Sequence, residues 1–236
     1  MPEPGKAINL PVFKSAKMQI RNIIFDLGGV LLNLDTQATI EAFRNLGIHQ
    51  FDNFFTLARQ DHLFDKLDKG EYTPEEFYQE IRRISGLELE EHKIDQAWNA
   101  MLLDLPSERI KLLEQARNHY NTYLLSNTNS IHYPAYTRYL KEAHGYESLA
   151  GLFNNHYLSH EIGMRKPDVE IFSFVIKENG LNPAETLFID DSPQHVEGSR
   201  KAGLWGYWLD LQKEKITDLF EEGKLRDSVM LRLQNQ

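Results

Sequence analysis

Residues 20–31 read Ile-Arg-Asn-Ile-Ile-Phe-Asp-Leu-Gly-Gly-Val-Leu, and this segment is the most informative about the fold class. Its first seven residues form a short run rich in β-branched and aromatic side chains, which favours a buried strand. The run ends at Asp26, and the glycines that follow are typical of a turn. The sequence therefore predicts a buried strand that presents a carboxylate at its carboxyl end.

Three more runs of the same kind follow along the chain. These predicted strands cover residues 120–126, Thr186–Asp190 and residues 204–209. Helical patterns lie between them, at residues 107–118 with Ser107 as the cap, at residues 168–179, and from Ser192 to Gly203. This alternation predicts an α/β fold, with a Rossmann-like parallel sheet core and helices on both faces.

The segment between the first and second predicted strands has a different pattern, with several helical stretches and no convincing strand. One helix begins at Thr73-Pro74-Glu75-Glu76, a capping box with proline at the first position, and another covers residues 90–103. We therefore expect a small all-helical domain at residues 37–105, inserted into a core of residues 18–36 and 106–236. Residues 1–17 are expected to be a poorly structured leader.

The composition restricts the functions that the chain can have. With 26 basic and 35 acidic residues, its formal charge of −9 argues against nucleic acid or an anionic membrane as partner. There are no cysteines, which excludes disulfides, thiolate nucleophiles and cysteine metal sites. No apolar run approaches the roughly 18 residues of a membrane span. Because residues 1–18 also lack a signal-peptide pattern, we expect a cytoplasmic protein; the oligomeric state stays open.

Polar side chains follow three of the predicted strands, where parallel sheets bind their ligands. They are Asp26, Ser126 with Asn127, and Asp190 with Asp191, to which Arg165-Lys166-Pro167 adds a cation. Each motif alone has a structural explanation, because such residues also form turns and solvated helix boundaries. The adjacent acids Asp190 and Asp191 point most directly to a metal, because they repel each other unless a cation compensates.

Taken in order, these motifs resemble the four motifs of the haloacid dehalogenase-like superfamily of hydrolases. The matching residues are Asp26 with its glycine-containing turn, Ser126, Lys166 followed by Pro167, and the pair Asp190-Asp191. The helical insert is similar to the cap domain of one subgroup. The resemblance implies an Mg²⁺-dependent phosphatase that acts on small phosphorylated metabolites.

The resemblance also implies which residues would act as nucleophile and which would bind the metal. Asp26 would be the nucleophile that attacks phosphorus and forms an aspartyl-phosphate. The carboxylate of Asp26, the backbone carbonyl of Gly28, and Asp190 or Asp191 would hold Mg²⁺, which prefers oxygen ligands.

Phosphate binding is implied for a second group of residues. Ser126 and the backbone N–H of Asn127 would bind the oxygens of the transferring phosphoryl group. Lys166 would bind the same group and neutralise the charge that develops during the reaction. Lys166 would also reduce the repulsion between Asp26 and the acidic pair.

Position 28 departs from the pattern of most phosphatases in this superfamily. They carry a second Asp two residues after the nucleophile, as general acid and base, whereas this chain has Gly28. Loss of such a group costs about 10²–10⁴-fold in rate. Asp35, His62 and Asp65 are candidates to replace it.

The motifs also resemble a narrower branch, the bacterial α-D-glucose-1-phosphate phosphatases, in which the same glycine occurs. The matching motifs are Asp-Leu-Gly-x-Val, Leu-Ser-Asn-Thr-Asn and Gly-Met-Arg-Lys-Pro. This resemblance implies a sugar phosphate as substrate.

Two other functions stay open. With Gly28, the chain could be a catalytically weak regulatory protein that binds metal and phosphate. A haloacid dehalogenase would use the same nucleophilic Asp on carbon. Dehalogenases need no metal, so the pair Asp190-Asp191 argues against that function.

Overall fold

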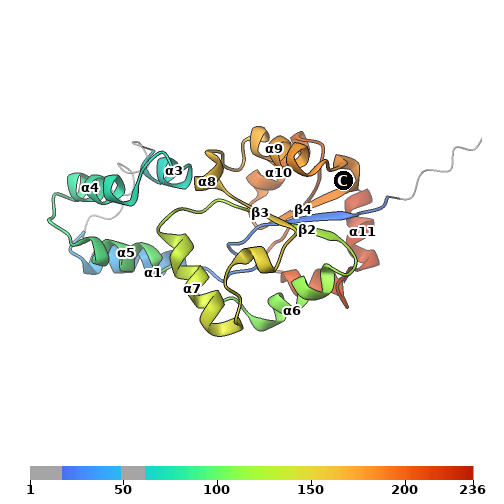
Figure 1. Ribbon diagram of the computed structural model, residues 1–236, viewed down its shortest axis with the longest axis horizontal. Helices are drawn as coiled ribbons and strands as arrows, with labels where there is room; N and C mark the ends of the chain where they lie inside the picture. Colours follow the sequence, from blue (N-terminus) through green and yellow to red (C-terminus); the bar gives the residue numbers. More distant parts are fainter. Residues whose placement is uncertain (1–17, 49–61, 236) are drawn as a thin grey trace, which may run out of the picture.

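The computed structural model of the chain describes residues 18–48 and 62–235 (Figure 1). The predicted leader at residues 1–17 lies outside the described residues. In the described part, an α/β core adjoins a group of helices at one end (Figure 1). None of the described helices has both the length and the apolar character required to cross a membrane.

The core is built on a five-stranded sheet in the order β3-β2-β1-β4-β5. Its strands are β1 (Asn22–Phe25), β2 (Asn121–Ser126), β3 (Asn155–Leu158), β4 (Thr186–Asp190) and β5 (Trp205–Trp208). All neighbouring strands pair in parallel. The predicted fold class is therefore confirmed, and the first predicted strand lies at the centre of the sheet.

The edge strand β3 was not predicted. Its sequence, Asn-His-Tyr-Leu, has two polar residues in four, and Asn155 is exposed while Tyr157 and Leu158 are buried. Residues of β3 pair with β2 from Tyr123 onward. Such a short strand forms because it completes the sheet, and its own pattern is too weak to indicate it.

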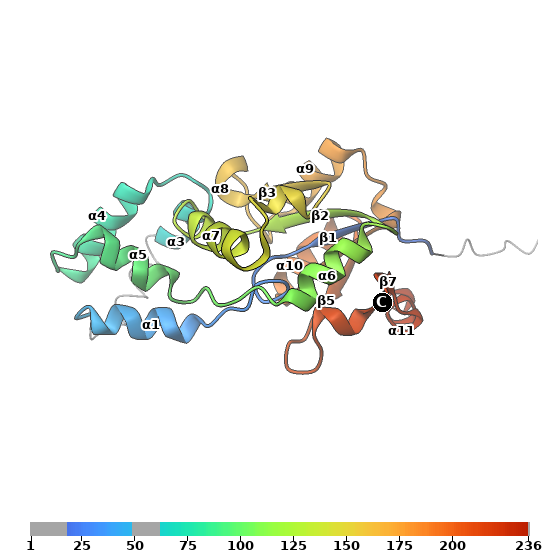
Figure 2. The same ribbon diagram turned by 60° about the horizontal axis from the view of Figure 1, so that its bottom comes forward.

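Helices cover both faces of the sheet (Figures 1 and 2). One face carries α6 (Ser107–Ala116), α7 (His132–His144) and α11 (Asp227–Gln234), and the other carries α9 (Val169–Asn179) and α10 (Pro193–Lys201). Successive residues of β1 supply both layers: Ile23 and Phe25 belong to the first hydrophobic cluster, and Ile24 belongs to the second. This alternation follows from the two-residue period of a strand.

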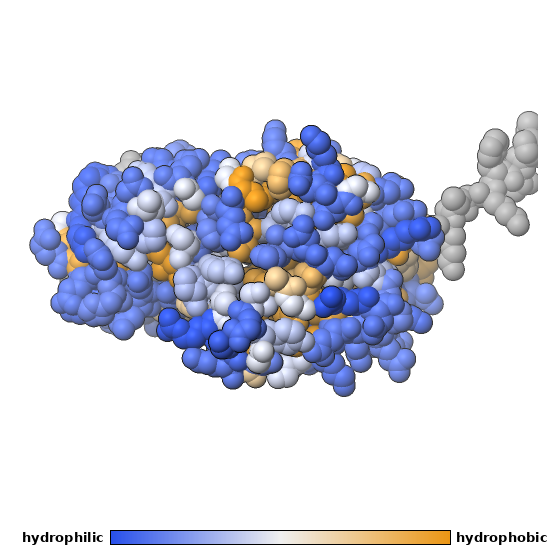
Figure 3. All heavy atoms as spheres, viewed as in Figure 1, coloured by the Kyte–Doolittle hydropathy of each residue, from blue (hydrophilic) through white to orange (hydrophobic). Residues whose placement is uncertain are grey.

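The remaining short elements connect this framework. They are α8 (Ser159–Ile162), the hairpin β6 (Phe220–Glu221) and β7 (Lys224–Leu225), and the 3₁₀ turns η1 (Leu149–Gly151), η2 (Pro183–Glu185) and η3 (Ile216–Leu219). Hydrophilic residues cover most of the face in Figure 3, and apolar ones form small separate patches.

Four described helices beyond the carboxyl ends of the strands form what we call the cap (Figure 1). They are α1 (Thr36–Asn45), α3 (Leu63–Asp68), α4 (Pro74–Ser85) and α5 (Glu91–Asn99). A hydrophobic cluster that includes Phe43, Leu67, Phe77 and Trp98 fills their centre. The domain boundaries expected at residues 37 and 105 stay a prediction.

The first residues of α4 and α6 can be compared with the helix starts that the sequence predicted. The capping box of α4 forms as predicted: Glu76 N–H donates to Thr73 Oγ1 at 3.2 Å, and Thr73 N–H donates to the Glu76 carboxylate at 2.8 Å. The predicted cap of α6 is wrong, because Pro106 is the N-cap residue and Ser107 is already helical. Proline sets an extended backbone at this point, so the chain enters the helix without a capping side chain.

Candidate active site

The site lies where β2, β1 and β4 end side by side. Ser126 and Asp190 are the last residues of β2 and β4, and Asp26 directly follows β1. The Asp26 N–H donates to the Ile189 carbonyl at 3.0 Å, which ties this carboxylate to the neighbouring strand. The sheet thus brings together residues about 160 positions apart, because parallel strands end at the same edge.

Lys166 lies at the centre of the site. Its Nζ donates to Asp26 Oδ1 at 2.6 Å and to Asp190 Oδ2 at 2.7 Å. Its side chain is fully buried. Such short, charge-assisted hydrogen bonds in a buried setting hold both carboxylates in fixed orientations.

The side chain of Asn127 holds the Lys166 backbone, a role that the sequence did not indicate. Asn127 Nδ2 donates to the Lys166 carbonyl, and the Lys166 N–H donates to Asn127 Oδ1, both at 2.9 Å. This pair of bonds joins the loop after β2 to the segment before α9. It fixes the main chain from which the lysine reaches the carboxylates.

The site carries more negative than positive charge. Carboxylate oxygens of Asp26, Asp190 and Asp191 lie within 4.8 Å of one another. Burial raises the pKa of Asp26 to about 7; Lys166 opposes this shift, and the charge of Asp190 adds to it. A set of three carboxylates that one ammonium only partly neutralises fits a divalent cation with oxygen ligands, as Mg²⁺ is.

The two acids after β4 have different surroundings. Asp190 accepts hydrogen bonds from Lys166, from the Ser192 N–H at 2.7 Å and from His195 Nδ1 at 3.0 Å. Burial by itself would raise the pKa of Asp190, but Lys166 and His195 lower it to about 2. Asp190 is therefore an ionised carboxylate that its protein partners already occupy.

Asp191 is partly exposed and lies against the turn after β1. Burial and the charge of Asp190 raise the pKa of its carboxyl. A Cβ at Gly29, which has φ of 74°, would overlap Asp191 Oδ2, so this approach requires glycine. Asp191 is thus the member of the pair that is better placed to accept a cation.

His195 is a site residue that the sequence analysis missed. It lies in the first turn of α10 and contacts both oxygens of Asp190 at 3.0 Å. A single histidine in the first turn of a helix has no distinctive spacing. Only the fold brings it back to the acid at the end of β4.

Ser126 is buried, with 2% of its surface exposed. Its hydroxyl contacts the Asn127 carbonyl oxygen at 3.5 Å, which is the long limit of a hydrogen bond. The hydroxyl is therefore available to a ligand oxygen at the end of β2.

A cavity of about 230 Å³, which we call the cap cavity, opens between this edge of the sheet and the cap. Gly28, Ser126 and Asn127 line it from the core, and Phe64, Asp68 and Trp98 line it from the cap. A ligand in the cap cavity would therefore contact the residues at the strand ends and the cap at once.

Three stacked rings form one wall of the cap cavity. The ring centroids of Phe64 and Trp98 lie 5.1 Å apart, with an angle of 6° between the ring planes. The centroids of Trp98 and His132 also lie 5.1 Å apart, with an interplanar angle of 7°. Burial lowers the pKa of His132 to about 3, so this ring is neutral at physiological pH. Trp98 Nε1 is buried and has no hydrogen-bond partner in the described part of the chain.

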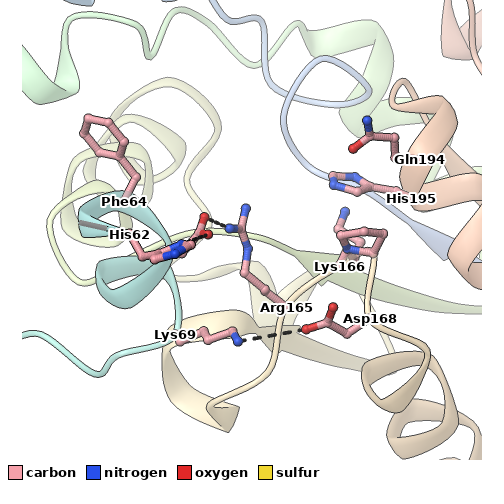
Figure 4. A pocket seen from close by; sticks show the side chains of 10 residues that line it. His62, Phe64, Lys69, Arg165, Lys166, Asp168, Gln194 and His195 are labelled. Atoms are coloured by element: carbon pink, nitrogen blue, oxygen red, sulfur yellow. Dashed lines mark ion pairs between the residues drawn. The ribbon is translucent and has the colours of Figure 1, made fainter. Parts of the chain in front are cut away.

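The three predicted replacements for the missing acid–base group do not line the cap cavity. Asp35 is the N-cap of α1 and accepts from the N–H groups of Gln37 and Ala38. His62 and Arg165 line a second cavity of about 550 Å³ (Figure 4), and Asp65, which lines it too, pairs with Arg165. Lys166 and His195 also line this second cavity, so the candidacy of Asp35, His62 and Asp65 as replacements for the acid–base group stays a prediction.

Comparison with known proteins identifies the class. The family model of the haloacid dehalogenase-like hydrolases matches residues 20–203. The chain therefore belongs to this family, as its four motifs predicted.

Individual proteins of this family are similar to the chain over most of its length. The chain is 31% identical over 187 residues to a D-ribitol-5-phosphate phosphatase of Bacteroides thetaiotaomicron, which covers 78% of this chain and 89% of that protein. A family enzyme from the same organism, solved in complex with magnesium and inorganic phosphate, is 38% identical with a TM-score of 0.77, covering 86% of this chain and 100% of that one. A HAD-like hydrolase from Porphyromonas gingivalis has 29% identity and a TM-score of 0.71, covering 92% and 99%. The narrower resemblance to α-D-glucose-1-phosphate phosphatases stays a prediction.

Proposed function

We propose that this protein is an Mg²⁺-dependent phosphatase that hydrolyses small sugar or polyol phosphates through an aspartyl-phosphate on Asp26. One observation carries the proposal: Lys166 holds Asp26 and Asp190 at 2.6 and 2.7 Å, with Asp191 beside them. Such a cluster offers a carboxylate that can attack phosphorus, a cation, and further carboxylates that can hold a metal. The ribitol phosphate phosphatase and the relative with bound magnesium and phosphate support the same activity.

The metal would be held by Asp26, Asp191 and the carbonyl of Gly28. Asp190 would act mainly by orienting Lys166, since its oxygens already accept from Lys166, Ser192 and His195. When bound, Mg²⁺ would offset the repulsion between the carboxylates and the phosphate.

The first chemical step would use the residues at the strand ends. An oxygen of Asp26 attacks phosphorus and forms an O–P bond, while the bond from phosphorus to the ester oxygen breaks and its electron pair leaves with that oxygen. The Ser126 hydroxyl, the Asn127 N–H and Lys166 would donate hydrogen bonds to the phosphoryl oxygens as charge moves between them. Water then cleaves the aspartyl-phosphate and regenerates Asp26.

The cap cavity favours a small, hydroxylated substrate. At about 230 Å³ it suits a small metabolite better than a macromolecule. Trp98 lines it, and its Nε1 is a buried donor without a partner in the described residues, which a hydroxyl oxygen that reached it would satisfy. The aromatic wall of Phe64, Trp98 and His132 offers a flat surface for its carbon chain.

Phosphate release tests the proposal. D-Ribitol 5-phosphate, sugar 1-phosphates and nucleoside monophosphates are each incubated with the protein in Mg²⁺ or in EDTA, alongside Asp26→Asn. We expect release from polyol or sugar phosphates in Mg²⁺, and none above background in EDTA or with the variant. Absence of release from every compound, together with phosphate binding, would instead favour the weak regulatory function.

A further inference from the structure

We propose that Asp68 of the cap is the catalytic acid that protonates the leaving oxygen and the base that later activates water. This inference rests on the proposed phosphatase function. Release of an alkoxide from phosphorus is slow unless the leaving oxygen receives a proton, and a positioned acid contributes about 10²–10⁴-fold. The site therefore needs a proton donor, and Gly28 offers no side chain for this purpose.

Asp68 lines the cap cavity together with Gly28, Ser126 and Asn127. It is the last residue of α3, and 18% of its side chain is exposed. Asp68 therefore lines the same cavity as Ser126 and Asn127, the residues that we propose bind the phosphoryl oxygens.

Two core residues next to the catalytic ones hold this carboxylate. Asn129 Nδ2, three residues after Ser126, donates to Asp68 Oδ1 at 3.1 Å. The Arg165 guanidinium, which directly precedes Lys166, lies 3.8 Å from Asp68 Oδ2. Because both contacts come from the core, Asp68 reaches its position over the site only when the cap is seated there.

The surroundings of Asp68 suit proton transfer near neutral pH. Burial raises the pKa of its carboxyl to about 6, against the hydrogen bond from Asn129. The Arg165 guanidinium, 3.8 Å from Asp68 Oδ2, favours the ionised form, and the neutral His132 lines the same cavity. The neighbours of Asp68 along the chain pair elsewhere, Asp65 with Arg165 and Lys69 with Asp168. An acid whose pKa is near the working pH can both give and recover a proton.

The other titratable groups around the site are less suitable. Lys166 is committed to two carboxylates. Because its pKa is about 3, His132 is a neutral imidazole near pH 7 and cannot act as an imidazolium acid. Asp65 contacts both His62 and Arg165 and does not line the cap cavity.

The proton balance of the reaction is closed by Asp68. As the bond from phosphorus to the ester oxygen breaks, that oxygen takes the Asp68 proton together with the bonding pair, and the alcohol departs. The Asp68 carboxylate then takes a proton from water while the water oxygen attacks phosphorus and the bond to Asp26 breaks. Inorganic phosphate leaves, and both carboxyl groups return to their starting states.

The test compares Asp68→Asn with wild type on two substrates that differ in their need for a proton. p-Nitrophenyl phosphate releases a stabilised phenolate, whereas D-ribitol 5-phosphate must release an alkoxide. The value of kcat/KM reports the first chemical step for each substrate. The asparagine keeps the shape of the side chain and can still accept from Asn129.

We expect Asp68→Asn to lower kcat/KM for D-ribitol 5-phosphate by about 10²-fold or more, and for p-nitrophenyl phosphate by less than about tenfold. Asp65→Asn, a carboxylate on the same helix outside the cap cavity, should affect both substrates alike and weakly. Equal losses on both substrates would overturn the proposal, because they indicate a structural role. So would an unchanged rate on the polyol phosphate.

Failure of the phosphatase function itself has a different signature. In that case wild-type protein releases no phosphate from either substrate in Mg²⁺, and Asp26→Asn is indistinguishable from it. Activity that Asp26→Asn abolishes but Asp68→Asn leaves intact would reject the acid alone.

Discussion

The carboxyl edge of the sheet and the cap cavity are neighbours, but they are held together by different forces. At the sheet edge, Lys166 is joined to Asp26 and Asp190 by hydrogen bonds of 2.6 and 2.7 Å. In the cap cavity, by contrast, stacked rings such as Phe64 and Trp98 form the wall. The first arrangement suits a fixed chemical step, because short charged contacts leave little freedom. The second offers flat apolar faces on which a carbon chain can pack, without charged groups that could take part in the reaction.

The strongest way to test this contrast is to remove the central cation. We expect Lys166→Met to lower kcat by about 10³-fold or more, because the variant lacks the charge that orients Asp26 and stabilises the phosphoryl group. In EDTA it should also lose about 3 kcal/mol of unfolding free energy, because two buried carboxylates lose their partner. Phosphate release and denaturant titration measure the two effects.

Lys69→Met is the matched control for this change. Lys69 lies 3.9 Å from Asp168 in a partly exposed pair, so its removal should alter stability by less than about 1 kcal/mol. Equal losses of unfolding free energy in the two variants would show that the ion pairs of Lys166 stabilise the fold no more than the partly exposed pair of Lys69 does.

The second prediction separates the two acids after β4. Asp191→Asn should raise the Mg²⁺ concentration for half-maximal activity by about 10–100-fold, because we propose Asp191 as a metal ligand. Asp190→Asn should mainly lower kcat, since Asp190 orients Lys166 and accepts from His195. A magnesium titration of each variant distinguishes them. The reverse pattern would make Asp190 the ligand.

The same contrast explains how much could be predicted from the sequence. The sheet edge is encoded locally: a buried strand and the acid that ends it are adjacent in the chain, so Asp26 and Asp190 were identified without a structure. The cap cavity depends on contacts between distant segments. Asp68 has no signal of its own, because its position follows from Asn129, 61 residues further along the chain.

The pH dependence of stability tests the cap side of the contrast. Burial lowers the pKa of His132 in the folded protein from 6.5 to about 3, so the unfolded chain binds more protons between these values. The contribution of the neutral ring is complete above pH 6.5 and is lost as the pH falls toward 3. Between pH 7 and 5, wild type should lose about 2 kcal/mol more unfolding free energy than His132→Phe.

Denaturant titrations at several pH values measure that difference, and His119→Phe is the control for removal of an exposed histidine. Phenylalanine at position 132 keeps a ring against Trp98, so the stack is retained while the titrating group is removed. The same pH slope in wild type and His132→Phe would mean that the ring reaches water.

The smallest expected effect concerns a single buried N–H. Trp98→Phe keeps a ring between Phe64 and His132 but removes Nε1, the donor without a partner in the described chain. If a substrate hydroxyl accepts from Nε1, KM for D-ribitol 5-phosphate should rise about fivefold, near 1 kcal/mol, with kcat little changed. KM for p-nitrophenyl phosphate, which has no such hydroxyl, should stay constant. A parallel rise for both substrates would assign the effect to the shape of the ring, and the cap cavity would then select by packing rather than by hydrogen bonding.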